Sequence, residues 1–170
     1  MRRHSLQTVA SIAAQSLLCI ALLSACAGPE KAPAPKLPAS IGSLALARTV
    51  EGVEANKLIY SMHGKATSAS TSAVGCYGGA DSKNVLYVSA FMNDNQARRA
   101  FDLMLSKMAA GPAGFSPPTK RSGPEQGIYE TTGSGLKHFF YQRGSNVIWW
   151  QAEPGIAEET FKTVFKTYLK

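Results

Sequence analysis

The sequence predicts an α+β domain, an antiparallel β-sheet of about five to six strands with two to three helices packed mainly on one face. Short runs rich in β-branched and aromatic residues occur in clusters, separated by Gly, Ser and Asn residues. A few longer segments instead carry apolar residues at helical spacing. The two kinds of segment do not alternate strictly, as they would in a parallel βαβ fold.

The first half of the domain is expected to contain a strand at residues 44–50, a helix at 54–63 and a strand hairpin. The hairpin joins strands at 73–78 and 85–92 across a polar turn. The apolar side chains that recur at helical spacing in the helix are Ala55, Leu58, Ile59 and Met62.

The clearest predicted helix follows Asn93, whose side chain can cap it, with Gln96 three residues later to complete a capping box. Gly111-Pro112 ends the helix. One stripe holds its apolar residues, which are Ala97, Ala100, Phe101, Met104, Leu105 and Met108. A stripe of this kind predicts core packing rather than a cofactor site.

Residues 111–126 form a long predicted loop with four prolines, three glycines and one obvious apolar anchor, Phe115. Loops longer than ~12–15 residues are usually functional or disordered. The composition leaves both open, and a flap over a binding face is the hypothesis that can be tested.

Three strands are predicted next, at residues 127–132, 136–143 and 147–152. A last helix begins after Gly155, with Glu158 in its first turn and lysines near its end, which complements the helix dipole. Its apolar stripe consists of Ala157, Phe161, Val164, Phe165 and Tyr168.

The first 26 residues have the order of an export signal: the basic start Arg2-Arg3, an apolar run at 9–23, then small residues before Cys26. At ~1.5 Å per residue the run spans only ~23 Å, short of the ~30 Å hydrocarbon core of a bilayer. A cleaved signal is therefore expected rather than a permanent transmembrane helix.

Leu23-Ser24-Ala25-Cys26 resembles the lipobox of bacterial lipoproteins. The resemblance implies cleavage between Ala25 and Cys26, diacylglyceryl attachment to the Cys26 thiol and acylation of the freed amine. Two or three acyl chains, for example palmitate, give a stable membrane anchor. Ala27 follows the cysteine in place of aspartate, which implies outer-membrane sorting if the organism is a diderm. The alternative is an ordinary secretory signal in which Cys26 is incidental.

Three regions are thus predicted: a signal peptide at residues 1–25, a lipidated Pro/Ala-rich linker at 26–40 and one α+β domain at 41–170. Prolines at four linker positions favour an extended conformation, and at ~3.1 Å per residue the 14 residues after Cys26 reach ~43 Å from the membrane. The domain is long enough to bury a core without disulfides or metal.

The net charge limits the classes of partner that the sequence predicts. Loss of Arg2 and Arg3 with the signal lowers the 18 basic residues to 16 against 11 acidic ones, a net +5. These charges are dispersed and do not form a nucleic-acid-binding pattern, so envelope lipids, glycans or proteins are the expected neighbours.

Cys76 is the lone thiol of the predicted domain. We interpret it as a buried core residue, with a reactive thiol as the alternative.

One sheet face is a candidate ligand site. In the second predicted hairpin of this region, His138 faces Gln151 and Phe140 faces Trp149, while the opposite, apolar side lies under the helices. If Gly133 to Gly135 closes the preceding hairpin, Glu130 falls beside His138. A carboxylate, an imidazole and an aromatic floor could then meet on a solvent-accessible face.

The leading functional interpretation is a non-enzymatic, lipid-anchored binding or assembly-accessory domain on the periplasmic side of the outer membrane. The alternative is a small envelope hydrolase or transferase that uses Glu130, His138 and Gln151. No catalytic motif, cofactor motif or cofactor is predicted. His63, Cys76 and His138 follow no metal-ligand spacing, so no metal site is predicted either.

Overall fold

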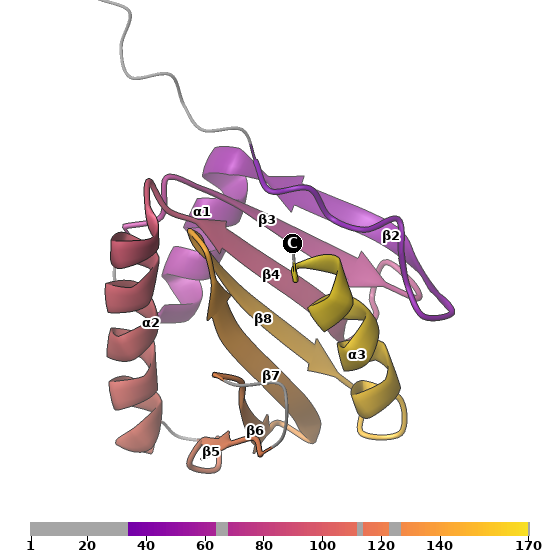
Figure 1. Cartoon of the computed structure of the whole chain (residues 1–170). Helices are drawn as coiled ribbons and strands as arrows, with labels where there is room; N and C mark the ends of the chain where they lie inside the picture. The colour runs from indigo at the N-terminus through magenta and orange to yellow at the C-terminus, as the bar shows by residue number, and fades with distance from the viewer. Residues whose placement is uncertain (1–33, 64–67, 112–113, 123–126, 170) are drawn as a thin grey trace, which may run out of the picture. The chain divides into compact units, whose positions relative to one another are not determined.

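A computed structural model describes residues 34–63, 68–111, 114–122 and 127–169. In these residues the chain forms three helices and one antiparallel sheet of eight strands, in the order β1-β2-β3-β4-β8-β7-β6-β5 (Figure 1). The elements are β1 (Ser40–Ile41), β2 (Leu44–Glu51), α1 (Gly52–His63), β3 (Thr71–Tyr77), β4 (Asn84–Ala90), α2 (Asp94–Ala109), β5 (Thr119–Lys120), β6 (Tyr129–Gly133), β7 (Leu136–Arg143), β8 (Asn146–Ala152) and α3 (Ala157–Thr167). The predicted α+β class is confirmed.

The sheet has more strands than the five to six predicted, and the difference lies in β1 and β5. Each has two residues and pairs with one neighbour, β1 with β2 and β5 with β6. A two-residue strand is too short to show a side-chain period of two, so alternation could not reveal it. The six longer strands all occur at the predicted positions within a few residues.

Helices cover both faces of the sheet, whereas the sequence predicted that they would lie mainly on one. Ala55 and Ile59 of α1 pack on Val74 and Val85 of the sheet. The ring of Phe101 in α2 contacts Phe140 on the same side, and α3 covers the opposite face. Figure 1 shows α3 in front of the strands, α1 partly behind them and α2 at the left of the view. Aromatic residues on both faces of β7 explain the two covered sides, because each needs a partner layer.

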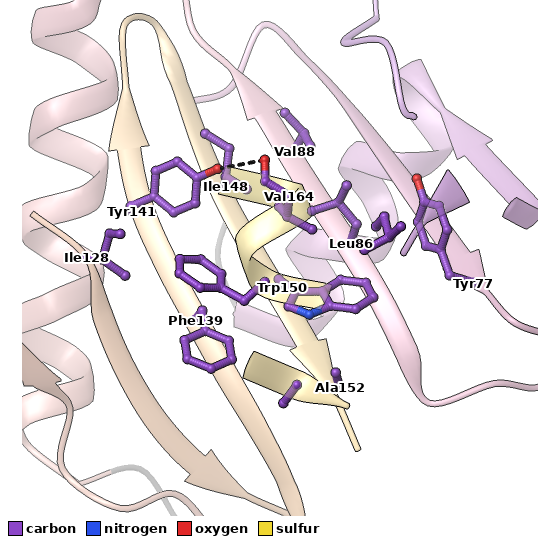
Figure 2. Packing of buried hydrophobic residues seen from close by; sticks show 13 residues of the cluster. Tyr77, Leu86, Val88, Ile128, Phe139, Tyr141, Ile148, Trp150, Ala152 and Val164 are labelled. Atoms are coloured by element: carbon purple, nitrogen blue, oxygen red, sulfur yellow. Dashed lines mark hydrogen bonds between the residues drawn. The ribbon is translucent and has the colours of Figure 1, made fainter. Parts of the chain in front are cut away.

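The main core lies between the sheet and α3 (Figure 2). The rings of Phe139 and Phe161 stack with centroids 4.4 Å apart. Two polar side-chain groups in this core form hydrogen bonds. The Tyr141 hydroxyl donates to the carbonyl of Val164, and Trp150 Nε1 donates to Thr160 Oγ1 at 3.2 Å. The strands contribute most of its buried side chains, namely Tyr77, Leu86, Val88, Phe139, Tyr141, Ile148, Trp150 and Ala152, together with Ile128 and neighbours from α3.

The predicted cap of α2 is confirmed. The Asn93 side chain accepts a hydrogen bond from the backbone N–H of Gln96 at 3.0 Å, which satisfies one of the free donors in the first turn. Ala97, Phe101 and Met108 from the predicted stripe are buried. Among the helices in the described part of the chain, none is long and apolar enough to cross a membrane.

The domain begins before residue 41, the boundary that the sequence predicted. Leu37 packs against the main core, and the carbonyl of Pro38 accepts a hydrogen bond from the buried Tyr77 hydroxyl at 2.9 Å. The hydroxyl of Tyr168, the residue that follows α3, donates a second hydrogen bond to the carbonyl of Lys36. Residues 34–41, most of which the sequence assigned to the linker, therefore pack against the core, and we refer to them as the strap.

Candidate functional site

The register of the hairpin β7–β8 is the predicted one. His138 pairs with Gln151 and Phe140 with Trp149, so these four residues share one face of the sheet. The turn between the strands includes Gly144, which has a positive φ of 52°. A tight turn of this kind fixes the register of the strands that it joins.

Glu130 does not join that face, and the predicted row of Glu130, His138 and Gln151 is wrong. Thr131 is the residue that pairs with His138, and Glu130 pairs with Phe139 on the α3 side. Only Ser134 and Gly135 form the turn, both with positive φ, whereas the prediction assumed a loop of three residues. A one-residue change in loop length moves every side chain of a strand to the other face.

His138 lies in a packed layer rather than on an accessible face, since only 3% of its surface is exposed. Trp149 Nε1 donates to His138 Nδ1 at 3.1 Å. His138 Nε2 lies 3.2 Å from the carbonyl of Gly133 and therefore carries the proton that it donates there. Burial lowers the pKa of His138, against a smaller opposing effect of the Gly133 carbonyl, so the ring is neutral at pH 7. Both nitrogens are used by the fold.

Of the aromatic residues predicted as a ligand floor, Phe140 belongs to the core and Trp149 is half-buried against it. Phe140 is fully buried and stacks on Trp149 with centroids 4.7 Å apart. Phe115, the predicted anchor of the long loop, packs against His138 at 5.1 Å between ring centroids. Gln151 donates its side-chain N–H to the carbonyl of Lys83. The predicted ligand face is therefore a second core layer, closed in part by α2 and Phe115.

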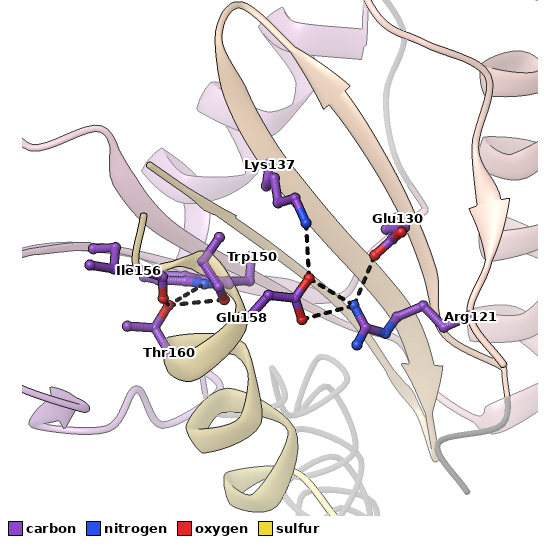
Figure 3. A network of polar contacts seen from close by, with 8 residues as sticks. Arg121, Glu130, Lys137, Trp150, Ile156, Glu158 and Thr160 are labelled. Carbon is purple, nitrogen blue, oxygen red and sulfur yellow. Dashed lines mark hydrogen bonds and ion pairs between the residues drawn. The ribbon is translucent and has the colours of Figure 1, made fainter. Parts of the chain in front are cut away.

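The Glu130 carboxylate instead belongs to an ion-pair network on the α3 side (Figure 3). Arg121 Nη1 lies 2.8 Å from Glu130 Oε2 and 3.1 Å from Glu158 Oε2. Lys137 Nζ binds the other Glu158 oxygen at 2.9 Å. The Arg121 guanidinium also lies over the Phe139 ring, 5.2 Å from its centroid. The network joins β6, β7 and α3 to the segment 114–122, which is thus docked on the domain.

The charges of this network shift one pKa clearly. Partial burial alone would raise the pKa of Glu158, but hydrogen bonds and positive charge from Lys137 and Arg121 together lower it. The carboxylate is accordingly ionised at neutral pH, and the two acidic and two basic side chains of the network balance in charge. A hollow of about 130 Å³ lies beside the network, lined by Ser116, Thr119, Glu130, Thr131, Thr132 and Lys137. The Ser116 hydroxyl already bonds to those of Thr131 and Thr132.

Cys76 is a free, buried cysteine, which confirms its interpretation as a core residue. It packs with Val74, Val85 and α1. The Arg48 guanidinium lies nearby, with its Nη2 atom 3.8 Å from the sulfur. In the described parts of the chain no three His, Cys, Asp or Glu residues come together as a metal site would require.

A second hollow, about 480 Å³ in volume, lies along the flank of α2, and we refer to it as the α2 hollow. It is lined by Ser68, Ser70, Met92, Gln96, Arg99, Ala100 and Leu103. Its volume falls in the ~300–1,000 Å³ range of ligand pockets. Met92 exposes 76% of its surface and Leu103 56%, although both are apolar. Large apolar side chains gathered on a surface mark interaction sites.

The sequence interpretation missed the α2 hollow because it followed only the apolar stripe of the helix. Met92, Gln96, Arg99 and Leu103 recur at intervals of four, three and four residues, which places them on one flank of a helix. This helical spacing is the sequence pattern that could have indicated the α2 hollow. Its residue types are mixed, however, and a mixed flank is the usual pattern of a solvated surface.

No protein-family model matches the chain, and neither a curated protein nor a solved structure matches it. The function is therefore argued from the residues of the chain itself. The predicted lipidation and cleavage positions, Cys26 and Ala25, lie outside the described residues.

Proposed function

We propose that this protein is a lipid-anchored envelope domain whose role is binding rather than catalysis, located on the periplasmic side of the outer membrane if the organism is a diderm. The N-terminal sequence supports the anchor: a basic start, a short apolar run and Leu23-Ser24-Ala25-Cys26. Acylated Cys26 would hold the protein in the lipid, and the domain would meet an envelope protein, glycan or lipid. Nucleic acid is not proposed as a partner.

The α2 hollow is the observation that carries the binding role. The more exposed of its two large apolar side chains, Met92, leaves 76% of its surface in water. A single exposed apolar side chain is ordinary, but Leu103 lines the same hollow, and apolar side chains that gather on a surface mark interaction sites. Met is also a flexible side chain that adapts to different surfaces.

The residues that the enzyme alternative requires do not lie together. It required Glu130 to orient His138 as a general base, and the two residues lie on opposite faces of the sheet. Both ring nitrogens of His138 are held by Trp149 and Gly133. A base needs a free nitrogen within reach of substrate. We therefore assign His138 a structural role and propose no hydrolase or transferase activity.

The anchor is tested by labelling cells with radioactive palmitate and separating their membranes. Wild-type protein should incorporate label and fractionate with the outer membrane of a diderm host. The Cys26→Ser variant should remain unprocessed or leave the membrane fraction, because the thiol that accepts the diacylglyceryl group is missing. Cys19→Ser is the matched control and should behave as wild type, since Cys19 lies inside the predicted signal. Equal labelling of wild type and Cys26→Ser would reject the anchor.

A further inference from the structure

The charge in the α2 hollow is unbalanced. Among the described residues that line it, Arg99 is the sole charged one. Within the described residues, the ion pairs of the domain involve Lys57, Arg121 and Lys137, and none of them uses Arg99. An exposed guanidinium beside apolar side chains is suited to a carboxylate that it can bind through two parallel hydrogen bonds.

The other side chains of the hollow indicate what carries that carboxylate. Met92 and Leu103 offer apolar contact, and the small side chain of Ala100 lies between helix positions that project further. Ser68, Ser70 and Gln96 add hydroxyl and amide groups that can bond to a peptide backbone. A peptide segment combines all three requirements: a carboxylate, an apolar side chain and backbone amides.

Two other ligand classes fit less well. A free acyl chain would leave much of its surface in water, because the apolar walls are themselves largely exposed and do not enclose a tunnel. An anionic membrane surface is attracted by clusters of several basic residues. Of the lining residues that the structure describes, Arg99 alone is basic, and Asp102 follows it on the same helix.

We propose that the α2 hollow binds a peptide segment of a partner protein in which an aspartate or glutamate lies next to a large apolar residue. The carboxylate pairs with Arg99, and the apolar side chain packs against Leu103, which lies one helical turn from Arg99. This inference rests on the proposed binding function and names its site and the chemistry of its partner.

The test selects peptides on the purified, detergent-solubilised full chain from a random peptide display library. Enriched sequences should share an acidic residue within one or two positions of Leu, Ile, Met or Phe. A synthetic fluorescent peptide of the enriched sequence then reports affinity by anisotropy. Arg99→Glu should weaken its binding roughly tenfold or more, since the charge that meets the carboxylate is reversed. Leu103→Ala should weaken binding by roughly tenfold through lost apolar contact.

The same helix offers a matched control for the charge. Arg98 is exposed and adjacent to Arg99 but does not line the hollow, so Arg98→Glu should leave the affinity within about twofold at matched ionic strength. Leu58 on α1 is exposed by 39%, and Leu58→Ala serves as the apolar control. All four variants change exposed side chains, and circular dichroism melts check that each keeps its fold.

Several results would overturn the proposal. These are a failure to enrich peptides, enrichment without the acidic–apolar pair, or equal effects of Arg98→Glu and Arg99→Glu. Arg99-dependent binding of phosphatidylglycerol vesicles without peptide binding would also overturn it, and would assign the hollow to lipid. The assay does not depend on acylation. Peptide binding by a protein that fails the palmitate test would therefore reject the anchor and keep the hollow, whereas the reverse result would reject the hollow alone.

Discussion

Two adjacent residues, Ser134 and Gly135, decide which side chains share a face of the sheet. Both have positive φ, of 52° and 75°, as the two-residue turns that match strand twist require. Their turn places Thr131 opposite His138 and turns Glu130 toward Arg121. Gly-Ser-Gly is compatible with a loop of two or three residues, so the sequence predicted the strands but not this register.

His138 is the residue whose role the structure changes most. The sequence predicted an accessible imidazole, but the ring is buried and bonded at both nitrogens. We predict that His138→Ala lowers the free energy of unfolding by ~2–4 kcal/mol at pH 7.5, from a cavity and an unpaired Trp149 N–H. Urea denaturation measures it. Gln151→Ala, on the facing strand, removes a single more exposed bond and should cost less than half as much.

The lowered pKa of His138 predicts that the stability of the fold depends on pH. Burial lowers the pKa of His138 in the folded chain, so the unfolded chain takes up its proton at a higher pH. The stabilisation is therefore complete above the ordinary histidine pKa of ~6.5 and declines as the pH falls from there toward the lowered value. Urea midpoints should drop between pH 7.5 and 5 for wild type and drop less for His138→Ala. Parallel profiles would show that other groups control the acid response.

Gly133 allows the Phe115 ring to reach His138. A Cβ atom at position 133 would lie 2.5 Å from Phe115 Cδ1, far inside normal contact. We predict that Gly133→Ala costs ~1–3 kcal/mol of stability, because the ring or the strand has to move. Differential scanning calorimetry measures the change. Gly155→Ala is the control, since its Cβ would meet nothing within 4 Å, and an equal loss in both variants would contradict the account.

At the scale of elements, the predictions succeeded where the sequence period was long. The six strands of five or more residues and all three helices were expected, and Asn93 caps α2 as predicted. The sequence of residues 111–126 lacked any period, and the docking of its described part, residues 114–122, depends on contacts with residues far along the chain. Phe115 reaches His138, and Arg121 reaches Glu158. Local sequence carries no signal for partners of this kind.

The edge strand β2 shows how this sheet limits unwanted pairing. Its register with β3 shifts between Leu46 and Arg48, which places a bulge at the exposed edge. β1 pairs only with Leu44 and Ala45, so the rest of the outer edge relies on the bulge and on exposed Arg48. Bulges and charged side chains on edge strands discourage edge-to-edge aggregation.

Glu158 is predicted to hold β5 and the segment around it onto α3. Its lowered pKa means that the stabilisation is present above the ordinary glutamate pKa of ~4.3 and is lost as the pH falls below that value. Glu158→Gln should speed hydrogen exchange of the Arg121 amide, which bonds to the Ile128 carbonyl, at pH 6. The loss of global stability should be ~1 kcal/mol or less, since the carboxylate is half exposed.

Glu159 provides the control for this network. It is the next residue of α3 and is exposed, and the ion pairs described for the domain do not include it. Glu159→Gln should leave exchange of the Arg121 amide unchanged at pH 6. The difference between wild type and Glu158→Gln should shrink as the pH is lowered below the ordinary glutamate pKa, because protonation removes the carboxylate charge. A difference that does not change with pH would assign the effect to shape rather than charge.

At the scale of the whole molecule, the strap formed by residues 34–41 shortens the spacer that was predicted between the proposed anchor and the domain. The carbonyls of Lys36 and Pro38 bind Tyr168 and Tyr77, so these residues are not available as a spacer. If Cys26 carries the proposed anchor, nine residues, 27–35, separate it from the first strap contact in place of the predicted fourteen, 27–40. At the polyproline-like rise of ~3.1 Å per residue, their reach is ~28 Å in place of ~43 Å.

The strap also makes a stability prediction for the domain as a unit. Ile41 is fully buried, and Leu37 lies against Gly75, where a Cβ would approach its Cδ1 to 2.9 Å. A variant that begins at Gly42 should lose ~3–5 kcal/mol relative to one that begins at Ala34, from two large apolar side chains and the partner of the Tyr77 hydroxyl. Both variants lack residues 1–33, so the difference in urea denaturation reports residues 34–41 alone. Equal midpoints would return these residues to the linker and restore the longer reach.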